Sequence, residues 1–273
     1  RIGVYISSVL ILVLSIIGIY QIEITGSRIE DLPKNTHYFK DIRFFEEEFD
    51  GIMPMEIVVD TKRKNGAIKP ATLRRMDQLG TVIEETPELS RPVSVVDLIK
   101  YSKQAFYNGI PKYYQLPTSQ ENTFIMDTVR KSSGEGNLLQ SFVDSTGQNA
   151  RLTTYLRDVK IDRMEEIEMD IQKAIAKFFP EERYNVFMTG KALLFLKGTR
   201  YLVKNLLISL ALAIGLISLF MAYLFRSFRM IIVSLVPNLL PLVVTAGLMG
   251  FLGIPIKPST ILVFSIAFGI SVD

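Results

Sequence analysis

Four stretches of the chain are long and almost wholly apolar. The first three each have about the 20 residues that a helix needs to cross the hydrocarbon core of a bilayer, and the fourth is shorter. A signal peptide is the alternative for the first stretch, but its apolar run is longer than usual and no small-residue cleavage site follows it. The pattern predicts three complete transmembrane helices and a truncated fourth, over residues 1–20, 202–225, 230–252 and 258–273.

Between the first two apolar stretches, residues 21–201 have the composition of a soluble domain. Hydrophobic and polar positions alternate in four short segments, which is typical of strands. These segments are residues 55–60, 92–96, 151–157 and 184–188. Apolar residues recur at helical spacing after each of the first and third segments, with the second helix predicted to begin at a capping box formed by Asp162 and Glu165.

This order of elements gives two strand–helix–strand units, which predicts a ferredoxin-like (split βαβ) domain. The predicted fold class is therefore membrane α-helical plus α+β, with this domain outside the cytoplasm between the first two transmembrane helices. The segment of residues 97–147 is too long for a simple connection, and it is expected to form a helical insertion. Its aromatic residues suit packing better than a path for an apolar substrate, although both interpretations stay open.

The short polar connection at residues 226–229 carries Arg226 and Arg229, and short loops rich in arginine and lysine stay in the cytoplasm. Lys257, in the other short loop, argues weakly in the opposite direction. This distribution predicts a multi-pass membrane protein with the large segment outside the cytoplasm.

Composition narrows the possible functions. The net charge of +3 is too small to indicate a nucleic-acid partner, and no basic stripe interleaved with aromatic residues occurs. With no cysteine and one histidine, His37, which we expect in a surface loop, the sequence offers neither a zinc site nor a catalytic triad. No enzymatic motif stands out, so we expect no enzyme and no metal.

Asn65-Gly66 follows a run of basic residues, and this pair predicts a hairpin turn.

Residues 226–273 contain a specific series of motifs: Arg-Ser-Phe-Arg, an apolar run with Pro237-Asn238 and Pro241, a glycine-rich segment ending at Pro255, and finally Phe-Gly-Ile-Ser-Val-Asp. This series resembles the resistance-nodulation-division (RND) superfamily, in particular the branch of hopanoid and mycobacterial lipid exporters, and more remotely the Patched-like proteins with a sterol-sensing domain. The rest of the chain is similar to that family only in its order of elements.

The resemblance implies that two such repeats form one transporter. Asp273 would correspond to the proton-relay acid, with Gly269 one helical turn before it. Protons would be the coupling ion, with no other cofactor. The expected partners are membrane lipids, a hydrophobic or lipid-like substrate and the second repeat of the same full-length protein.

Physical arguments favour the same residues. A carboxylate at mid-membrane depth costs about 2.5–3.5 kcal/mol, so Asp273 is expected to have a function or a partner. In a low dielectric its pKa should rise, which would let it load and release a proton. Gly269 lies on the same helix face, where it either admits a neighbouring helix beside the acid or serves ordinary packing. Pro237 and Pro241 should kink the third span, and Asn238 is a possible polar contact, with a purely structural role as the alternative.

The sequence thus predicts the N-terminal half of a proton-driven RND-type exporter of hydrophobic or lipid-like molecules. One alternative is a lipid- or sterol-sensing receptor of the Patched-like type, and another is a translocation auxiliary like SecD and SecF. Residues 191–225 form a nearly uninterrupted helical pattern, which is expected to couple the extracytoplasmic domain to the second span.

Overall fold

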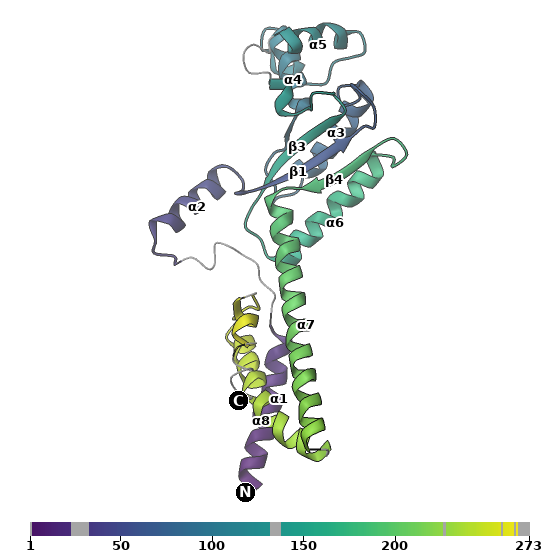
Figure 1. Cartoon of the computed structure of the whole chain (residues 1–273). Helices are drawn as coiled ribbons and strands as arrows, with labels where there is room; N and C mark the ends of the chain where they lie inside the picture. The colour runs from purple at the N-terminus through teal and green to yellow at the C-terminus, as the bar shows by residue number, and fades with distance from the viewer. Residues whose placement is uncertain are drawn as a thin grey trace. The chain divides into compact units, whose positions relative to one another are not determined.

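The computed structural model describes residues 2–22, 33–131, 138–225, 228–257, 259–264 and 266 (Figure 1). The chain divides into two compact units. One unit contains both ends of the chain, residues 1–26 and 196–273, and the other contains residues 27–195. The division separates the apolar helices from the mixed α/β part of the chain.

The unit that contains the chain ends consists of long apolar helices. These are α1 (Ile2–Tyr20), most of α7 (Lys191–Phe225) and α8 (Phe228–Phe251). Within the described residues, one helix, spanning 191–224, is long and apolar enough to cross a membrane, and α1 and α8 contain shorter apolar stretches over 6–20 and 239–251. Residues 259–264 are helical, and the rest of the predicted fourth span after residue 266 lies outside the described residues.

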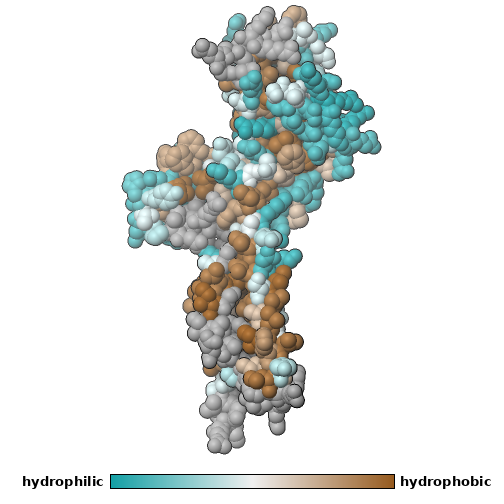
Figure 2. All heavy atoms as spheres, in the orientation of Figure 1, coloured by the Kyte–Doolittle hydropathy of each residue, from teal (hydrophilic) through white to brown (hydrophobic). Residues whose placement is uncertain are grey.

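Hydrophobic side chains point outward from these helices. Figure 2 shows them as brown patches along the helices, whereas hydrophilic residues dominate the visible surface of the α/β unit. Exposed examples on α1 and α7 are Val9, Leu10, Ile17, Leu212, Leu219 and Phe220. Outward-facing apolar side chains are what a helix needs in lipid, so this surface agrees with a membrane-associated protein.

Helices α1 and α8 touch at small residues. A Cβ atom added to Gly247 would lie 2.7 Å from the Cβ of Ser15, and Cβ atoms at Gly18 or Gly250 would collide with the backbone of the facing helix. The Ser15 hydroxyl donates a 2.8 Å hydrogen bond to its own helix at Ile11 O, so it brings no unsatisfied donor into the contact. Small residues of this kind let two backbones approach closely where lipid provides no hydrophobic driving force.

The α/β unit is built on one antiparallel sheet of four strands. The strands are β1 (Met53–Asp60), β2 (Val93–Ser94), β3 (Asn149–Leu156) and β4 (Asn185–Thr189), in the spatial order β2-β3-β1-β4. Because β1 pairs antiparallel with β3 and β4, and β2 with β3, strands β1 and β2 run one way and β3 and β4 the other. Each parallel pair is joined through a helix.

These two joining helices, α3 (Pro70–Glu84) and α6 (Ile161–Phe178), contact each other and cover one face of the sheet. Alternate residues of β1 and β3 are buried on that face, as the period of a strand requires. The core is formed by Ile57, Val59, Leu152, Leu156, Leu73, Met76, Leu79, Ile83, Ile167 and Ile171. The other face carries the half-exposed Tyr155 and Phe187.

In the insertion, residues 95–131 and 138–141 contain helices. They are α4 (Val95–Phe106), α5 (Glu121–Lys131) and the short 3-10 turns η1 (Pro111–Tyr113) and η2 (Leu138–Ser141). Tyr107 stacks on Tyr113 with 4.2 Å between ring centroids, and Tyr101 meets Tyr114 edge-on at 4.9 Å. These aromatic side chains therefore pack against one another, as the preferred interpretation of the cluster proposed.

Three local predictions were wrong. Residues 92–96 form only the two-residue β2, because Ser94 and Asp97 make a capping box that starts α4 at Val95. At the start of α6, Lys160 is the N-cap and has no side-chain cap, so the predicted Asp162–Glu165 box does not form. Asn65-Gly66 lies in the loop between β1 and α3, so it closes no hairpin.

That loop is fixed by contacts with a distant turn. Asn65 has a positive φ of 56° and its amide donates to Thr146 O, while the Ala67 amide donates to Gly147 O. Asparagine tolerates this left-handed conformation, which explains why the Asn-Gly pair was misleading. His37 is exposed as expected, but it begins the helix α2 (His37–Glu48) instead of lying in a loop.

Candidate functional site

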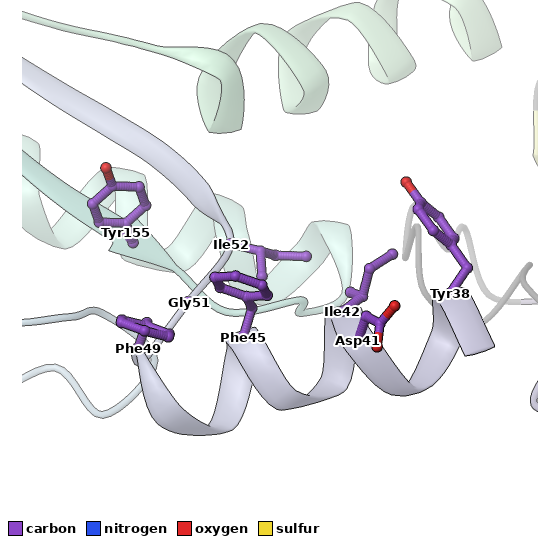
Figure 3. A pocket seen from close by; sticks show the side chains of 8 residues that line it. All are labelled: Tyr38, Asp41, Ile42, Phe45, Phe49, Gly51, Ile52 and Tyr155. Carbon is purple, nitrogen blue, oxygen red and sulfur yellow. The ribbon is translucent and has the colours of Figure 1, made fainter.

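A concave site of the α/β unit lies beside α2. Its volume is about 640 Å³, within the range of pockets that hold small molecules. We call it the α2 groove, and it is lined by Tyr38, Asp41, Ile42, Phe45, Phe49, Gly51, Ile52 and Tyr155. In Figure 3, Tyr38, Ile42 and Phe45 project from one side of α2, with Ile52 facing Phe45 and Tyr155 near Phe49.

Helix α2 forms because its start is capped and its apolar residues recur at helical spacing. Thr36 is in the extended conformation, and its hydroxyl accepts a hydrogen bond from the Phe39 amide at 3.3 Å. Tyr38, Ile42, Phe45 and Phe49 are separated by four, three and four positions, so they share one face of the helix. No residue of α2 is buried, so this aromatic face is available to a ligand.

Polar contacts hold α2 against the sheet. Glu46 Oε1 accepts a 2.6 Å hydrogen bond from the Asp158 amide, and Arg157 forms an ion pair with Asp50. The Ile52 amide donates to Leu156 O at 3.2 Å, which carries the chain from α2 into β1. These contacts fix one side of the groove to the end of β3.

Gly51 makes the close approach between the α2–β1 connection and β3 possible. Its φ of +146° lies in a region that favours glycine, and an added Cβ would come within 2.9 Å of the backbone of Tyr155. A side chain at this position would push the start of β1 away from β3. The width of the groove therefore depends on this glycine.

Among the residues that the structure describes, Asp41 is the one charged residue that lines the groove. Its Oδ2 atom lies 2.8 Å from Nδ1 of His37, whose side chain is 91% exposed. Four of the other lining residues are aromatic. The groove thus combines a mostly apolar surface with one carboxylate.

A second, polar cluster lies where the insertion meets the sheet. Tyr114 donates a 2.9 Å hydrogen bond to Asp97, and burial together with this bond raises the pKa of Tyr114 to about 12. Lys100 lies 2.5 Å from Asp77 of α3. The cavity here is only about 50 Å³, so these groups fasten the insertion and leave little room for a ligand.

Inside the insertion, Lys103 is almost fully buried and lies 2.9 Å from Glu121. Glu121 also accepts hydrogen bonds from the Thr118 amide at 2.8 Å and the Tyr107 hydroxyl at 3.0 Å. The Thr118 amide and Lys103 together lower the pKa of Glu121 to about 2. Because every charged group here is paired within α4 and the segment leading to α5, we interpret the cluster as a structural clip.

Within the described ranges, no group of three or more His, Cys, Asp or Glu side chains is placed to hold a metal ion. The sequence predictions for the site concern the apolar unit. Asp273 and Gly269 lie outside the described residues. Pro237, Asn238 and Pro241 lie inside α8, which is assigned as helix on both sides of each proline. Their proposed roles stay predictions.

Both prolines are exposed in this chain, and the Thr245 hydroxyl donates a 2.8 Å hydrogen bond to Pro241 O. A side-chain donor of this type satisfies carbonyl groups around a helix proline. This region and the α2 groove belong to different units of the chain.

The α2 groove was not predicted from the sequence, because no helix or strand was expected over residues 33–50. The signal was present, since a Thr cap precedes apolar residues at positions 38, 42, 45 and 49. Tyr155 could not be linked to them from the sequence, because it reaches the groove only through the antiparallel pairing of β1 with β3.

An α/β domain whose chain continues into a helix long and apolar enough to cross a membrane is compatible with a membrane-associated protein. Residues 31–273 match the model of the MMPL family, and the chain belongs to this family. No curated protein matches the chain. Membership of this family agrees with the RND-type transporter that the motifs of residues 226–273 predicted, and with a membrane-associated location.

Proposed function

We propose that this chain is the N-terminal repeat of a proton-driven exporter of hydrophobic or lipid-like molecules in a bacterial inner membrane, related to the lipid-exporter branch of the RND superfamily. The MMPL match over residues 31–273 is the observation that carries this proposal. In this proposal the chain needs no enzymatic centre, and the second repeat of the full-length protein would complete the transport path.

The proposed extracytoplasmic porter domain is ferredoxin-like. Its support is the order β2-β3-β1-β4, with each parallel pair of strands joined by a helix on one face and separated by a strand of opposite direction. The two arginines at residues 226 and 229 support a cytoplasmic loop between the second and third spans, which would place this domain in the periplasm.

In this proposal Asp273 takes up and releases the coupling proton. A carboxyl group between helices is favoured in its neutral form, so a change of protonation changes the buried charge and biases helix positions. Gly269 would allow the close approach of a helix from the second repeat, and Asn238 near the two prolines would contribute a polar contact. Lipids of the bilayer would surround the outward-facing apolar side chains.

Helix α7 supports a mechanical link between the proton site and the porter domain. It begins at Lys191, directly after β4 ends at Thr189, and continues for 35 residues. A movement of the second span would therefore be transmitted to the strand that precedes it. The chain contains no cysteine, so two cysteines introduced into it for spin labels would be its only labelling sites.

The test is proton-driven efflux from proteoliposomes that contain the complete protein. Asp273→Asn should abolish efflux of a lipid-like probe under an imposed proton gradient, whereas Asp170→Asn, at an exposed position of α6, should leave it unchanged. Unchanged efflux in Asp273→Asn would refute the proton-relay role. Binding of the probe without efflux in the unmodified protein would favour the receptor alternative.

Double electron–electron resonance tests the coupling through α7. Labels on the porter domain and on the second span should show a distance distribution that changes between acidic and neutral pH in the complete protein. A single distribution at every pH would contradict the coupling while leaving the proton-relay test untouched.

A further inference from the structure

Starting from the proposed export of hydrophobic molecules, on which this inference rests, we propose that the α2 groove selects amphiphiles that carry a cationic amine or quaternary ammonium group. The groove would hold the apolar body of such a molecule, and its positive group would lie between Asp41 and the neighbouring aromatic rings.

The lining of the groove combines aromatic rings with aliphatic side chains. Tyr38, Phe45, Phe49 and Tyr155 present aromatic rings, and Ile42 and Ile52 present aliphatic surface. Aromatic faces attract cations through the ring quadrupole, which contributes about 0.5–2 kcal/mol depending on desolvation. Rings of this kind accept an apolar body, and their faces favour a cation over an anion.

Asp41 gives the groove a negative charge, and among the described residues it is the one charged side chain of the lining. Its side chain is half-exposed, so the carboxylate is accessible from the groove. A carboxylate lowers the free energy of a bound cation and raises that of a bound anion, by up to about 1 kcal/mol at a partly exposed position. Asp41 therefore discriminates by charge, while the rings supply most of the affinity.

The walls of the groove are held in place by contacts between α2 and the sheet. The Glu46 contact with the Asp158 amide, the ion pair between Arg157 and Asp50 and the tight turn at Gly51 fix α2 against the end of β3. These contacts engage Glu46 and Asp50, while Asp41 lines the groove with its Oδ2 atom 2.8 Å from Nδ1 of the exposed His37. A groove whose walls are fixed before binding loses less entropy when the ligand enters.

Photo-crosslinking with three probes tests the proposal. Each probe is a dodecyl chain with a diazirine, ending in trimethylammonium, hydroxyl or carboxylate, and adducts on the whole 273-residue chain in lipid nanodiscs are mapped by mass spectrometry. The trimethylammonium probe should reach half-saturation of the groove peptides at about three- to tenfold lower concentration than the other two, as one cation–π contact and one ion pair would give.

Two pairs of variants locate the effect. Asp41→Asn should remove the preference for the cation and Asp41→Glu should restore it, whereas Glu47→Gln, an exposed acid of the same helix outside the groove, should change nothing. Phe45→Ala should weaken labelling by all three probes, and Phe44→Ala should not, because Phe44 is equally exposed but does not line the groove.

Equal labelling by the cationic and hydroxyl probes, an unchanged preference in Asp41→Asn, or adducts mainly outside the groove would each overturn the proposal. The assay needs neither a proton gradient nor transport. A lost charge preference would therefore refute this inference alone, while failure of efflux in the complete protein would refute the proposed exporter.

Discussion

The two units of this chain use hydrophobic residues in opposite ways. In the α/β unit, large side chains such as Leu79 and Ile57 are fully buried between the sheet and its helices. In the helical unit, α1 and α8 meet through Ser15, Gly18 and Gly247, and large apolar side chains point outward. Burying apolar surface stabilises a domain in water, but lipid removes that driving force, so close backbone packing takes its place.

The largest expected effect concerns the buried hydrophobic core of the α/β unit. Leu79→Ala should lower the free energy of unfolding of the α/β unit by about 2–5 kcal/mol, because it removes a fully buried side chain and leaves a cavity. Hydrogen–deuterium exchange measured by mass spectrometry on the whole chain would show faster exchange in α3 and β1.

Leu194→Ala is the matched control for this variant. Leu194 is 73% exposed, so its truncation should change stability by less than about 0.5 kcal/mol. Equal effects of the two leucine variants would show that the α/β unit does not depend on the core described above.

The next effect tests the helical unit with two glycines. Gly247→Ala should destabilise the α1–α8 contact by about 1–3 kcal/mol, because the new Cβ meets Ser15 and the backbones must separate. Gly215→Ala in α7 should instead be neutral or stabilising by up to about 1 kcal/mol, because its Cβ has open space and alanine favours helix.

Thermal unfolding of each glycine variant in detergent, followed by circular dichroism, measures this difference. Opposite signs for the two alanines would confirm that close backbone approach, and not helix propensity, dominates at Gly247. A stabilised Gly247→Ala variant would contradict the contact between α1 and α8.

The smallest effect concerns acid. The folded pKa of Glu121 is about 2, below its ordinary value of 4.5, so its carboxylate stabilises the fold fully above about pH 4.5. This contribution is lost as the pH falls from 4.5 toward 2, because the folded state must then take up a proton that the unfolded state already holds. Acid should therefore loosen α4 and α5 before it affects the α1–α8 contact.

Glu121→Gln should remove this part of the pH dependence. Its difference from the unmodified chain in the free energy of unfolding should be largest near neutral pH and shrink between pH 4.5 and 2. A difference that stays constant over this range would show that the carboxylate charge does not stabilise the insertion.

Much of the fold follows from local patterns. The alternation at Met55, Ile57 and Val59 predicted β1, and the helical spacing of Leu73, Met76 and Leu79 predicted α3, because burial on one face imposes the period of each element. The 35-residue α7 matches its predicted bounds, since a long apolar pattern leaves no alternative to a helix.

Local patterns failed where a nearby side chain or a distant segment decided the conformation. Strand β2 ends at Ser94 because Ser94 and Asp97 cap α4. The Asn65 loop forms no hairpin because the backbone amides of Asn65 and Ala67 donate hydrogen bonds to the distant turn at Thr146 and Gly147. The α2 groove shows the same division. The aromatic spacing of α2 is visible in the sequence, but the position of Tyr155 is not.

The sequence by itself predicted the apolar stretches, the strand–helix–strand order and an acid, Asp273, within an apolar stretch, because length, period and charge are properties of short segments. Only the tertiary structure decided that α1 and α8 meet at glycines and that α2 and β3 enclose a groove around Asp41. Those arrangements depend on contacts between residues far apart in the chain, and such contacts are set by packing of the whole unit.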